Sequence, residues 1–174
     1  DYFGFLTMCN SAGIDFEGKK VLILGSGGTS ATVYTAASDM GAREIIIVSR
    51  TGKENYNNLS RHWDSDVIVN TTPVGMYPNN GDSLIDLKDF SNCSGVVDVI
   101  YNPLRTRLIE SAQELGIPCT GGLTMLVAQA YYAAKLFTKG LPDITFDESN
   151  DREQIESLRK LLLRRICNIV LVGM

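Results

Sequence analysis

The chain has 174 residues, 44% of them hydrophobic, and a formal net charge of −4. This composition is typical of one globular domain with a sizeable core, and it excludes a disordered chain. An acidic chain is also not expected to bind nucleic acid, because that binding needs clustered Lys and Arg that acids do not balance.

Cysteine usage and apolar patterning indicate the setting of the protein. The cysteines lie far apart and form no C-x-x-C pair, which predicts reduced thiols and no metal site. No apolar run is long enough to span a membrane, and we expect no leader sequence. The sequence therefore predicts a cytoplasmic protein without membrane association, and its abrupt start at Asp1 predicts the middle of a longer protein.

Strands and helices are predicted to alternate along most of the chain. The strands are short and rich in β-branched residues, as in parallel sheets that are covered on both faces. The pattern predicts strand 20–24, helix 30–40, strand 44–49, strand 67–70, strand 96–100, helix 106–115, strand 117–120 and helix 124–138. This order predicts an α/β fold, a Rossmann-like, mainly parallel twisted sheet with helices on both faces. The polar segment 52–66 is too short for a full helix plus another strand, and the apolar segment 1–12 is expected to pack on the sheet.

A glycine-rich turn joins the first strand to the first of these helices. Its sequence is Gly25-Ser26-Gly27-Gly28-Thr29, followed by Ser30. Gly25 permits a tight reversal, Gly27 lets the backbone approach a pyrophosphate, and small Ser30 stands where a third glycine is usual. A turn that binds nothing is the alternative, but the flanking strand and helix favour a dinucleotide site at the helix N-terminus.

The second strand ends in a basic segment, where a site for NAD would carry an Asp or Glu. The segment is Ser49-Arg50-Thr51-Gly52-Lys53. A guanidinium with a hydroxyl beside it suits the 2′-phosphate of NADP, because it donates two charge-assisted hydrogen bonds. The alternative is a solvated basic turn.

Two other features carry no chemistry in this interpretation. His62 and Asp64 are near neighbours in sequence, but neighbours of this kind do not orient one another, so a surface loop is favoured over a catalytic pair. Helix 106–115 has a regular apolar stripe and is expected to pack on the sheet.

The last part of the chain changes character. Asn150 and Glu153 form a capping box, which predicts a helix over 150–166. Residues 168–172 are an apolar run that leads into a glycine, as at the start of a phosphate-binding loop. We therefore expect a first domain over 1–142, and over 143–174 a linker helix followed by the first strand of a P-loop kinase domain.

Three further blocks follow the glycine turn in a fixed order. They are Asn70-Thr71-Thr72-Pro73-Val74-Gly75-Met76, Asp98-Val99-Ile100-Tyr101-Asn102-Pro103 and Gly121-Gly122-Leu123-Thr124-Met125-Leu126-Val127-Ala128-Gln129-Ala130. Together they closely resemble the cofactor domain of the shikimate dehydrogenases, over residues 1 to about 142. The resemblance implies reduction of 3-dehydroshikimate to shikimate with NADP, in aromatic amino-acid synthesis. It also implies that the substrate domain and the catalytic lysine precede Asp1.

The resemblance assigns roles to individual residues. Asp1 matches the aspartate of a D-x-x-G block, so it would act in catalysis and also bind substrate. Tyr101 and Gln129 would contact the substrate. The cofactor would be bound by Gly25, Ser26, Gly27, Gly28, Thr29, Ser49, Arg50, Thr51, Lys53, Thr71, Thr72, Pro73, Val74, Val99, Gly122 and Met125. Ser49 replaces a common Asn, and Lys53 lies one position early. Taken without the resemblance, Met125 is equally suited to the core and Gln129 to an exposed helix face.

Other interpretations stay open at this point. A quinate/shikimate dehydrogenase that uses NAD has the same fold, and a non-catalytic nucleotide-binding regulatory module is a different class. The run at 168–172 is similar to the start of shikimate kinase, so a fused kinase is the partner that we expect. The sequence leaves the oligomeric state open.

Overall fold

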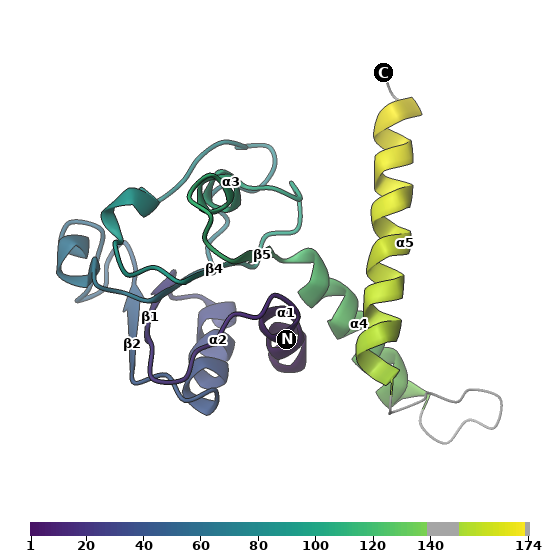
Figure 1. The fold of residues 1–174 in the computed structure, drawn as a ribbon, viewed down its shortest axis with the longest axis horizontal. Coiled ribbons are helices and arrows are strands. Elements are labelled where there is room, and N and C mark those ends of the chain that lie inside the picture. Colours follow the sequence, from purple (N-terminus) through teal and green to yellow (C-terminus); the bar gives the residue numbers. More distant parts are fainter. Residues whose placement is uncertain (139–149, 173–174) are drawn as a thin grey trace.

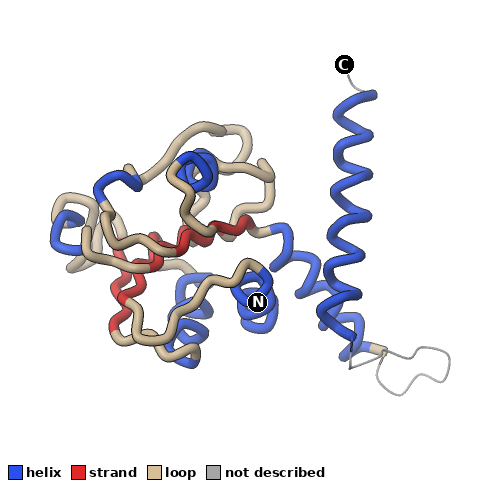
Figure 2. Tube along the Cα trace, in the orientation of Figure 1, coloured by secondary structure: helices blue, strands red, loops and turns tan. Residues whose placement is uncertain are grey.

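The computed structural model describes residues 1–138 and 150–172. A five-stranded sheet has the order β2-β1-β3-β4-β5, and every neighbouring pair is parallel. The strands are β1 (Lys20–Leu24), β2 (Glu44–Val48), β3 (Val67–Asn70), β4 (Gly95–Asp98) and β5 (Cys119–Gly121). The predicted parallel, Rossmann-like sheet is confirmed, and Figure 2 shows its strands running between helices.

Helices cover both faces of the sheet. They are α1 (Tyr2–Ser11), α2 (Gly28–Asp39), α3 (Arg107–Glu114), α4 (Leu123–Phe137) and α5 (Asp151–Val172), with short 3₁₀ turns η1 (Leu59–His62) and η2 (Leu87–Asp89). Helices α1 and α2 lie on one face and α3 on the other, while α4 leads away from β5 to α5 (Figure 1). In the described part of the chain, no helix combines the length and apolar character needed to cross a membrane.

The central strand β1 shows why its sequence is apolar without interruption. Val21 and Ile23 point to the core under α1 and α2, and Leu22 and Leu24 to the core under α3. All of these side chains are buried. A strand with helices on both faces has no polar side to expose, so the sequence has no period of two.

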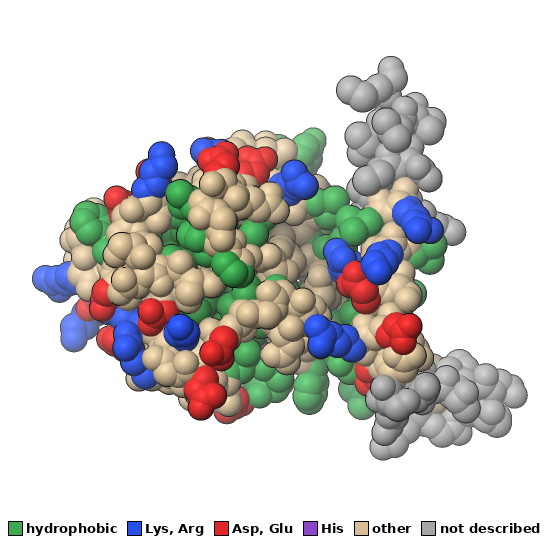
Figure 3. Space-filling model, viewed as in Figure 1, with side chains coloured by type: hydrophobic (Ala, Val, Ile, Leu, Met, Phe, Trp, Pro, Cys, Tyr) green, Lys and Arg blue, Asp and Glu red, His purple; other side chains and the backbone are tan. Residues whose placement is uncertain are grey.

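Ion pairs cover the end of the sheet at which the strands begin. Lys20 is only 5% exposed, and its Nζ lies 2.7 Å from Asp64 and 3.7 Å from Glu44. Asp66 accepts the backbone N–H of Lys20 and lies 3.4 Å from Arg43. Figure 3 shows the same interspersion of basic and acidic groups elsewhere on the surface, including α5.

Several boundaries differ from the sequence prediction. β4 ends at Asp98, before the predicted end at residue 100, because the Asp98 carboxylate accepts the N–H of Ile100 and turns the chain. The segment 1–12 contains a helix that the sequence did not predict. Residues 168–172 were predicted as a strand but continue α5. A helix satisfies its backbone within the segment, whereas a strand needs a neighbour to pair with.

The described residues include only part of the region where the chain was predicted to divide into two domains. The boundary at 142 falls outside the described residues. The predicted linker helix corresponds to the first part of α5, which is fixed to α4 by a hydrogen bond from the Tyr131 hydroxyl to Asp151 and an ion pair between Lys135 and Asp151. The assignment of 143–174 to a kinase stays a prediction.

Candidate cofactor and substrate site

The strands end in one row, which brings the predicted site segments to the same edge of the sheet. Leu24 lies beside Asn70, Asn70 beside Asp98, and Asp98 beside Gly121. Val48 of β2 lies beside Leu24 on the other side. The glycine turn, the 71–74 segment and the loop with Tyr101 therefore start at one level, where open α/β sheets bind their ligands.

The glycine turn is held tightly against the segment that follows β3. Gly25 has φ +106°, and a Cβ on it would lie 2.8 Å from Thr71 Oγ1 and 2.9 Å from Thr72 Cγ2. Its N–H donates to the carbonyl of Val48, and the Thr71 hydroxyl donates to the carbonyl of Leu24. Only glycine fits this conformation and this space without strain.

The other side of the turn is open and can receive an anion. A Cβ on Gly27 or Gly28 would meet no atom within 4 Å, and both residues are exposed. Helix α2 begins at Gly28, so its N-terminal N–H groups and positive dipole end face this open space. Ser30 is buried beneath the turn, as expected of a small residue where helix meets strand. The turn fits a pyrophosphate.

The basic segment after β2 presents its cations at the surface. Arg50, Thr51 and Lys53 are exposed, whereas Ser49 donates its N–H to the carbonyl of Glu54. The amide of Asn58 donates to the carbonyl of Lys53, so the loop is ordered by its own hydrogen bonds. None of these hydrogen bonds uses the cationic groups of Arg50 and Lys53.

His62 and Asp64 have separate partners in the fold. His62 Nε2 lies 3.0 Å from the carboxylate of Glu54, and this hydrogen bond lowers the pKa of Glu54. Asp64 is paired with Lys20 instead. His62 is buried, however, so the prediction of a surface loop is wrong for this residue. Its imidazole anchors the loop to Glu54.

A buried polar pair lies at the ends of β3 and β4, and sequence reasoning did not identify it. Asn70 Nδ2 donates to Asp98 Oδ1 across 3.1 Å, and Asn70 Oδ1 accepts the N–H and hydroxyl of Thr72. Asp98 also accepts the Ile100 N–H and the Thr106 hydroxyl. Burial raises the pKa of Asp98 to about 6, against the effect of these hydrogen bonds. Asn70 and Asp98 each begin a motif block, and this position is the sequence signal that could have indicated the pair.

Asp1 and Gln129, both predicted to hold substrate, are in contact. Gln129 Nε2 donates to Asp1 Oδ1 across 2.7 Å, which joins α1 to α4. Gly4 lies at the crossing of the two helices, where a Cβ would be 2.8 Å from both Gln129 Cγ and the Met125 carbonyl oxygen. Tyr101, the third predicted contact, is half exposed on the loop after β4.

The remaining predicted cofactor residues divide between surface and core. Gly122 donates its N–H to the carbonyl of Ile100, and a Cβ on it would lie 2.0 Å from the Val99 carbonyl oxygen. Met125 is only 5% exposed and packs in the core under α1 and α2, as does Val99 at its margin. Pro73 is exposed and Val74 half-buried on the turn after β3. The core alternative for Met125 is the one that the structure favours.

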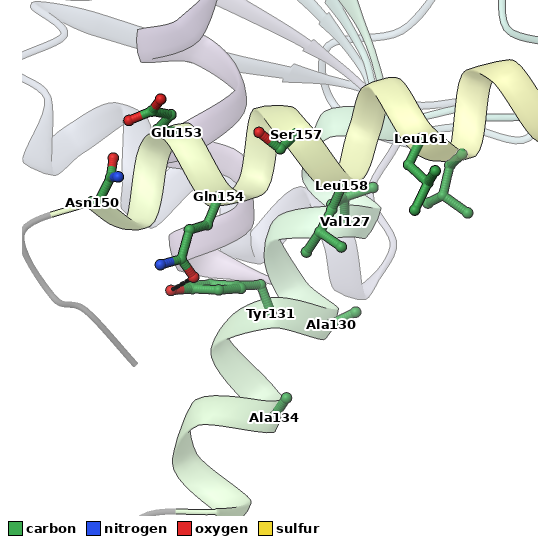
Figure 4. A pocket seen from close by; sticks show the side chains of 11 residues that line it. Val127, Ala130, Tyr131, Ala134, Asn150, Glu153, Gln154, Ser157, Leu158 and Leu161 are labelled. Atoms are coloured by element: carbon green, nitrogen blue, oxygen red, sulfur yellow. Dashed lines mark hydrogen bonds between the residues drawn. The ribbon is translucent and has the colours of Figure 1, made fainter. Parts of the chain in front are cut away.

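A cavity of about 910 Å³ lies between α4 and α5. Figure 4 shows apolar side chains such as Val127 and Leu158 on its walls, and the hydrogen bond from Tyr131 to Gln154 at one end. None of the predicted site residues lines it. The cavity therefore does not belong to the site at the strand ends.

Comparison with known proteins supports a family. No family model matches the chain. A shikimate dehydrogenase (NADP(+)) of Clostridium perfringens is 30% identical over 172 residues, which cover 91% of this chain and 62% of that protein. A chorismate mutase/shikimate 5-dehydrogenase fusion protein from Clostridium acetobutylicum has 34% identity and a TM-score of 0.78, over 91% of this chain and 60% of that one. Shikimate dehydrogenase 1 from Peptoclostridium difficile has 34% identity and a TM-score of 0.77, over 92% and 60%.

The chain thus spans about three fifths of the length of the relatives that it matches. The matched region includes the parallel sheet, the glycine turn and the helices around them. Over most of its own length the chain is a homologue of the shikimate dehydrogenases, and it has the fold of their C-terminal NADP-binding domain.

Proposed function

We propose that this chain is the NADP-binding part of an enzyme that interconverts 3-dehydroshikimate and shikimate. The observation that carries the proposal is the contact between Asp1 and Gln129. The family resemblance gives both residues to the substrate, and in this chain they come from opposite ends of the domain to within a hydrogen bond of each other. The glycine turn at the strand ends supplies the matching cofactor site.

The choice of NADP rests on the loop after β2. An NAD site places a carboxylate there to bind the ribose hydroxyls. Residues 49–53 contain no acid, and the nearest carboxylate, Glu54, is engaged by His62. Arg50 and Thr51 are exposed on this loop, so both can reach a 2′-phosphate. The Clostridium perfringens relative is named for the same cofactor.

The residues of this chain would bind and orient the two reactants. When bound, the nicotinamide supplies the hydride that reduces the ketone, or accepts it in the reverse direction. The turn 25–29 would hold the pyrophosphate, and Asp1 would act on the substrate oxygen, which needs a proton when the carbonyl becomes an alcohol. In the family a lysine of the preceding domain works with this aspartate, so we place turnover in a longer protein.

The setting of the protein and its fusion are further proposals. A cytoplasmic location agrees with the free thiols of Cys9, Cys93 and Cys119. A shikimate kinase that continues beyond Met174 would consume the product of the proposed reaction. Size and sequence of the natural transcript test that fusion directly, because a stop codon after Met174 contradicts it.

The proposed function is tested in two steps. Titration of the chain with NADP and with NAD should show binding of both, with NADP bound more tightly. The longer protein should then form NADPH when shikimate is added with NADP. Stronger binding of NAD would favour the NAD-using quinate/shikimate enzyme. Binding without any effect of shikimate on NADP affinity in the longer protein would favour the regulatory module.

A further inference from the structure

The carboxylate of Asp98 joins two loops that carry different parts of the site. Its side chain is completely buried, and its two oxygens accept three hydrogen bonds from groups on three segments. A buried carboxylate is costly unless such donors satisfy it. None of these contacts reaches the open space where a ligand would bind, and the family resemblance assigns Asp98 no role.

One branch of the network leads from Asp98 to the turn at 71–74. Asn70 Nδ2 donates to Asp98 Oδ1 (3.1 Å) and to the carbonyl of Val74 (3.4 Å), which fixes the orientation of the amide. Asn70 Oδ1 can then accept both the N–H (3.0 Å) and the hydroxyl (2.7 Å) of Thr72. The Thr72 hydroxyl oxygen in turn accepts the Val74 N–H. The turn therefore takes its shape from an amide that Asp98 orients.

The other branch leads to the loop that carries Tyr101. The N–H of Ile100 donates to Asp98 Oδ1 (3.1 Å), immediately before Tyr101. The Thr106 hydroxyl donates to Asp98 Oδ2 (2.6 Å) and caps α3 by accepting the N–H of Ile109. Both ends of this loop are thus tied to one carboxylate.

We propose that Asp98 is a positioning residue that sets the 71–74 turn, through Asn70, and the Tyr101 loop in one arrangement. Cofactor affinity then depends on a side chain that does not touch the cofactor. This inference rests on the proposed function, because it takes the 71–74 turn to be part of the NADP site. It predicts that removal of the Asp98 carboxylate weakens NADP binding more than does a substitution elsewhere that costs the same stability.

The first experiment compares NADP affinities of variants of the whole chain by calorimetric titration. Asp98→Ala should weaken NADP by about tenfold or more, because it leaves three buried donors unsatisfied. Asp98→Asn should stay within about threefold of the parent, since the amide oxygen can accept from Asn70 and Ile100 while its NH₂ donates to Thr106. The matched control is Ile14→Ala, because Ile14 is buried against Gly95 at the opposite end of the same strand. It should lose stability and keep its NADP affinity.

A second variant tests the route through Asn70 and serves if Asp98→Ala fails to fold. Asn70→Ala should weaken NADP to a similar extent. The double variant should be little weaker than either single one, because both remove the same connection. Losses that multiply in the double variant would overturn the route through Asn70.

Amide hydrogen exchange separates this inference from the proposed function, since it needs no cofactor. In the chain without ligand, Asp98→Ala should speed exchange of the Thr72 and Ile100 amides and leave those of α2 protected. Unchanged protection at Thr72 and Ile100, or an equal loss of NADP affinity in Ile14→Ala, would overturn the positioning role. Failure of the parent chain to bind NADP would instead refute the proposed function.

Discussion

Gln129 donates a hydrogen bond to the carboxylate of Asp1 across 2.7 Å, although 128 positions of sequence separate the two residues. The contact is possible because Gly4 lets α1 approach α4 closely. The amide occupies Oδ1 and leaves the second carboxylate oxygen to other partners. The carboxylate is therefore oriented without being neutralised.

Asp1→Asn tests the catalytic role of this carboxylate. Asparagine keeps the acceptor for Gln129 but loses the charge, so in the longer protein turnover should fall by about two orders of magnitude or more. NADP affinity should hardly change. Steady-state kinetics and titration measure both. The control is Asp15→Asn, an exposed aspartate just beyond α1 that accepts the nearby N–H of Glu17. Unchanged turnover in Asp1→Asn would sink the assignment.

Arg50→Ala tests the choice of cofactor. A 2′-phosphate gains charge-assisted hydrogen bonds from the guanidinium that NAD cannot form, so NADP should weaken by roughly 1.5–3 kcal/mol and NAD hardly at all. Titration with both cofactors gives the difference. Arg61→Ala, an exposed arginine of the same crossover, should affect neither. Equal losses for NADP and NAD would mean that Arg50 serves the adenine or the fold.

Two glycine substitutions should affect different properties, Gly27→Ala the affinity for NADP and Gly122→Ala the stability of the fold. Gly27→Ala places a methyl group in open space at φ −82°, so the midpoint of thermal unfolding should barely change, while NADP weakens by about tenfold or more where its pyrophosphate must approach. Gly122→Ala forces a methyl group to within 2.0 Å of the Val99 carbonyl oxygen, so it should cost about 1–3 kcal/mol of stability. A reversed order of the two melting temperatures contradicts this division.

The buried Asp98 makes stability depend on pH. Its pKa is raised in the folded chain to about 6, from 3.8 when unperturbed, so ionisation opposes folding. The stabilisation is complete below about pH 4 and is lost as the pH rises through about 6, for a total of about 3 kcal/mol. Asp98→Asn cannot ionise, so its free energy of unfolding should gain on that of the parent over this range.

Urea denaturation of both proteins from pH 4 to pH 8 measures this gain. The comparison matters because other carboxylates act in the opposite direction. Hydrogen bonds lower the pKa of Glu54 and Asp64, so the contribution of these carboxylates to the stability of the fold is lost as the pH falls. They are the same in both proteins and cancel in the difference. Parallel pH profiles would show that Asp98 titrates normally.

The sequence predicted elements whose pattern is local and missed contacts that the fold creates. The bounds of β1 and β3 agree with the prediction because each is an unbroken apolar run that ends at a turn or a polar residue. The end of β4 was missed because it depends on the side chain of Asp98, and the helix at 168–172 because an apolar run fits helix and strand alike.

The site shows the same division. The glycine turn could be recognised because its sequence spacing encodes its geometry. The link between Asn70 and Asp98 could not, because it forms between neighbouring strands that are distant in sequence. Met125 was assigned to the cofactor through the resemblance, and its burial reflects the packing of α1 on α4, which no local pattern predicts.

The charged pairs at the beginning of the strands affect how a dinucleotide would reach its site. Lys20 and Arg43 are matched there by Glu44, Asp64 and Asp66, so that edge offers an approaching anion no net attraction. At the opposite edge Arg50 and Lys53 are exposed beside the open glycine turn. These exposed cations therefore attract an approaching dinucleotide toward the glycine turn, and the rate of association, more than that of dissociation, should slow as salt is added.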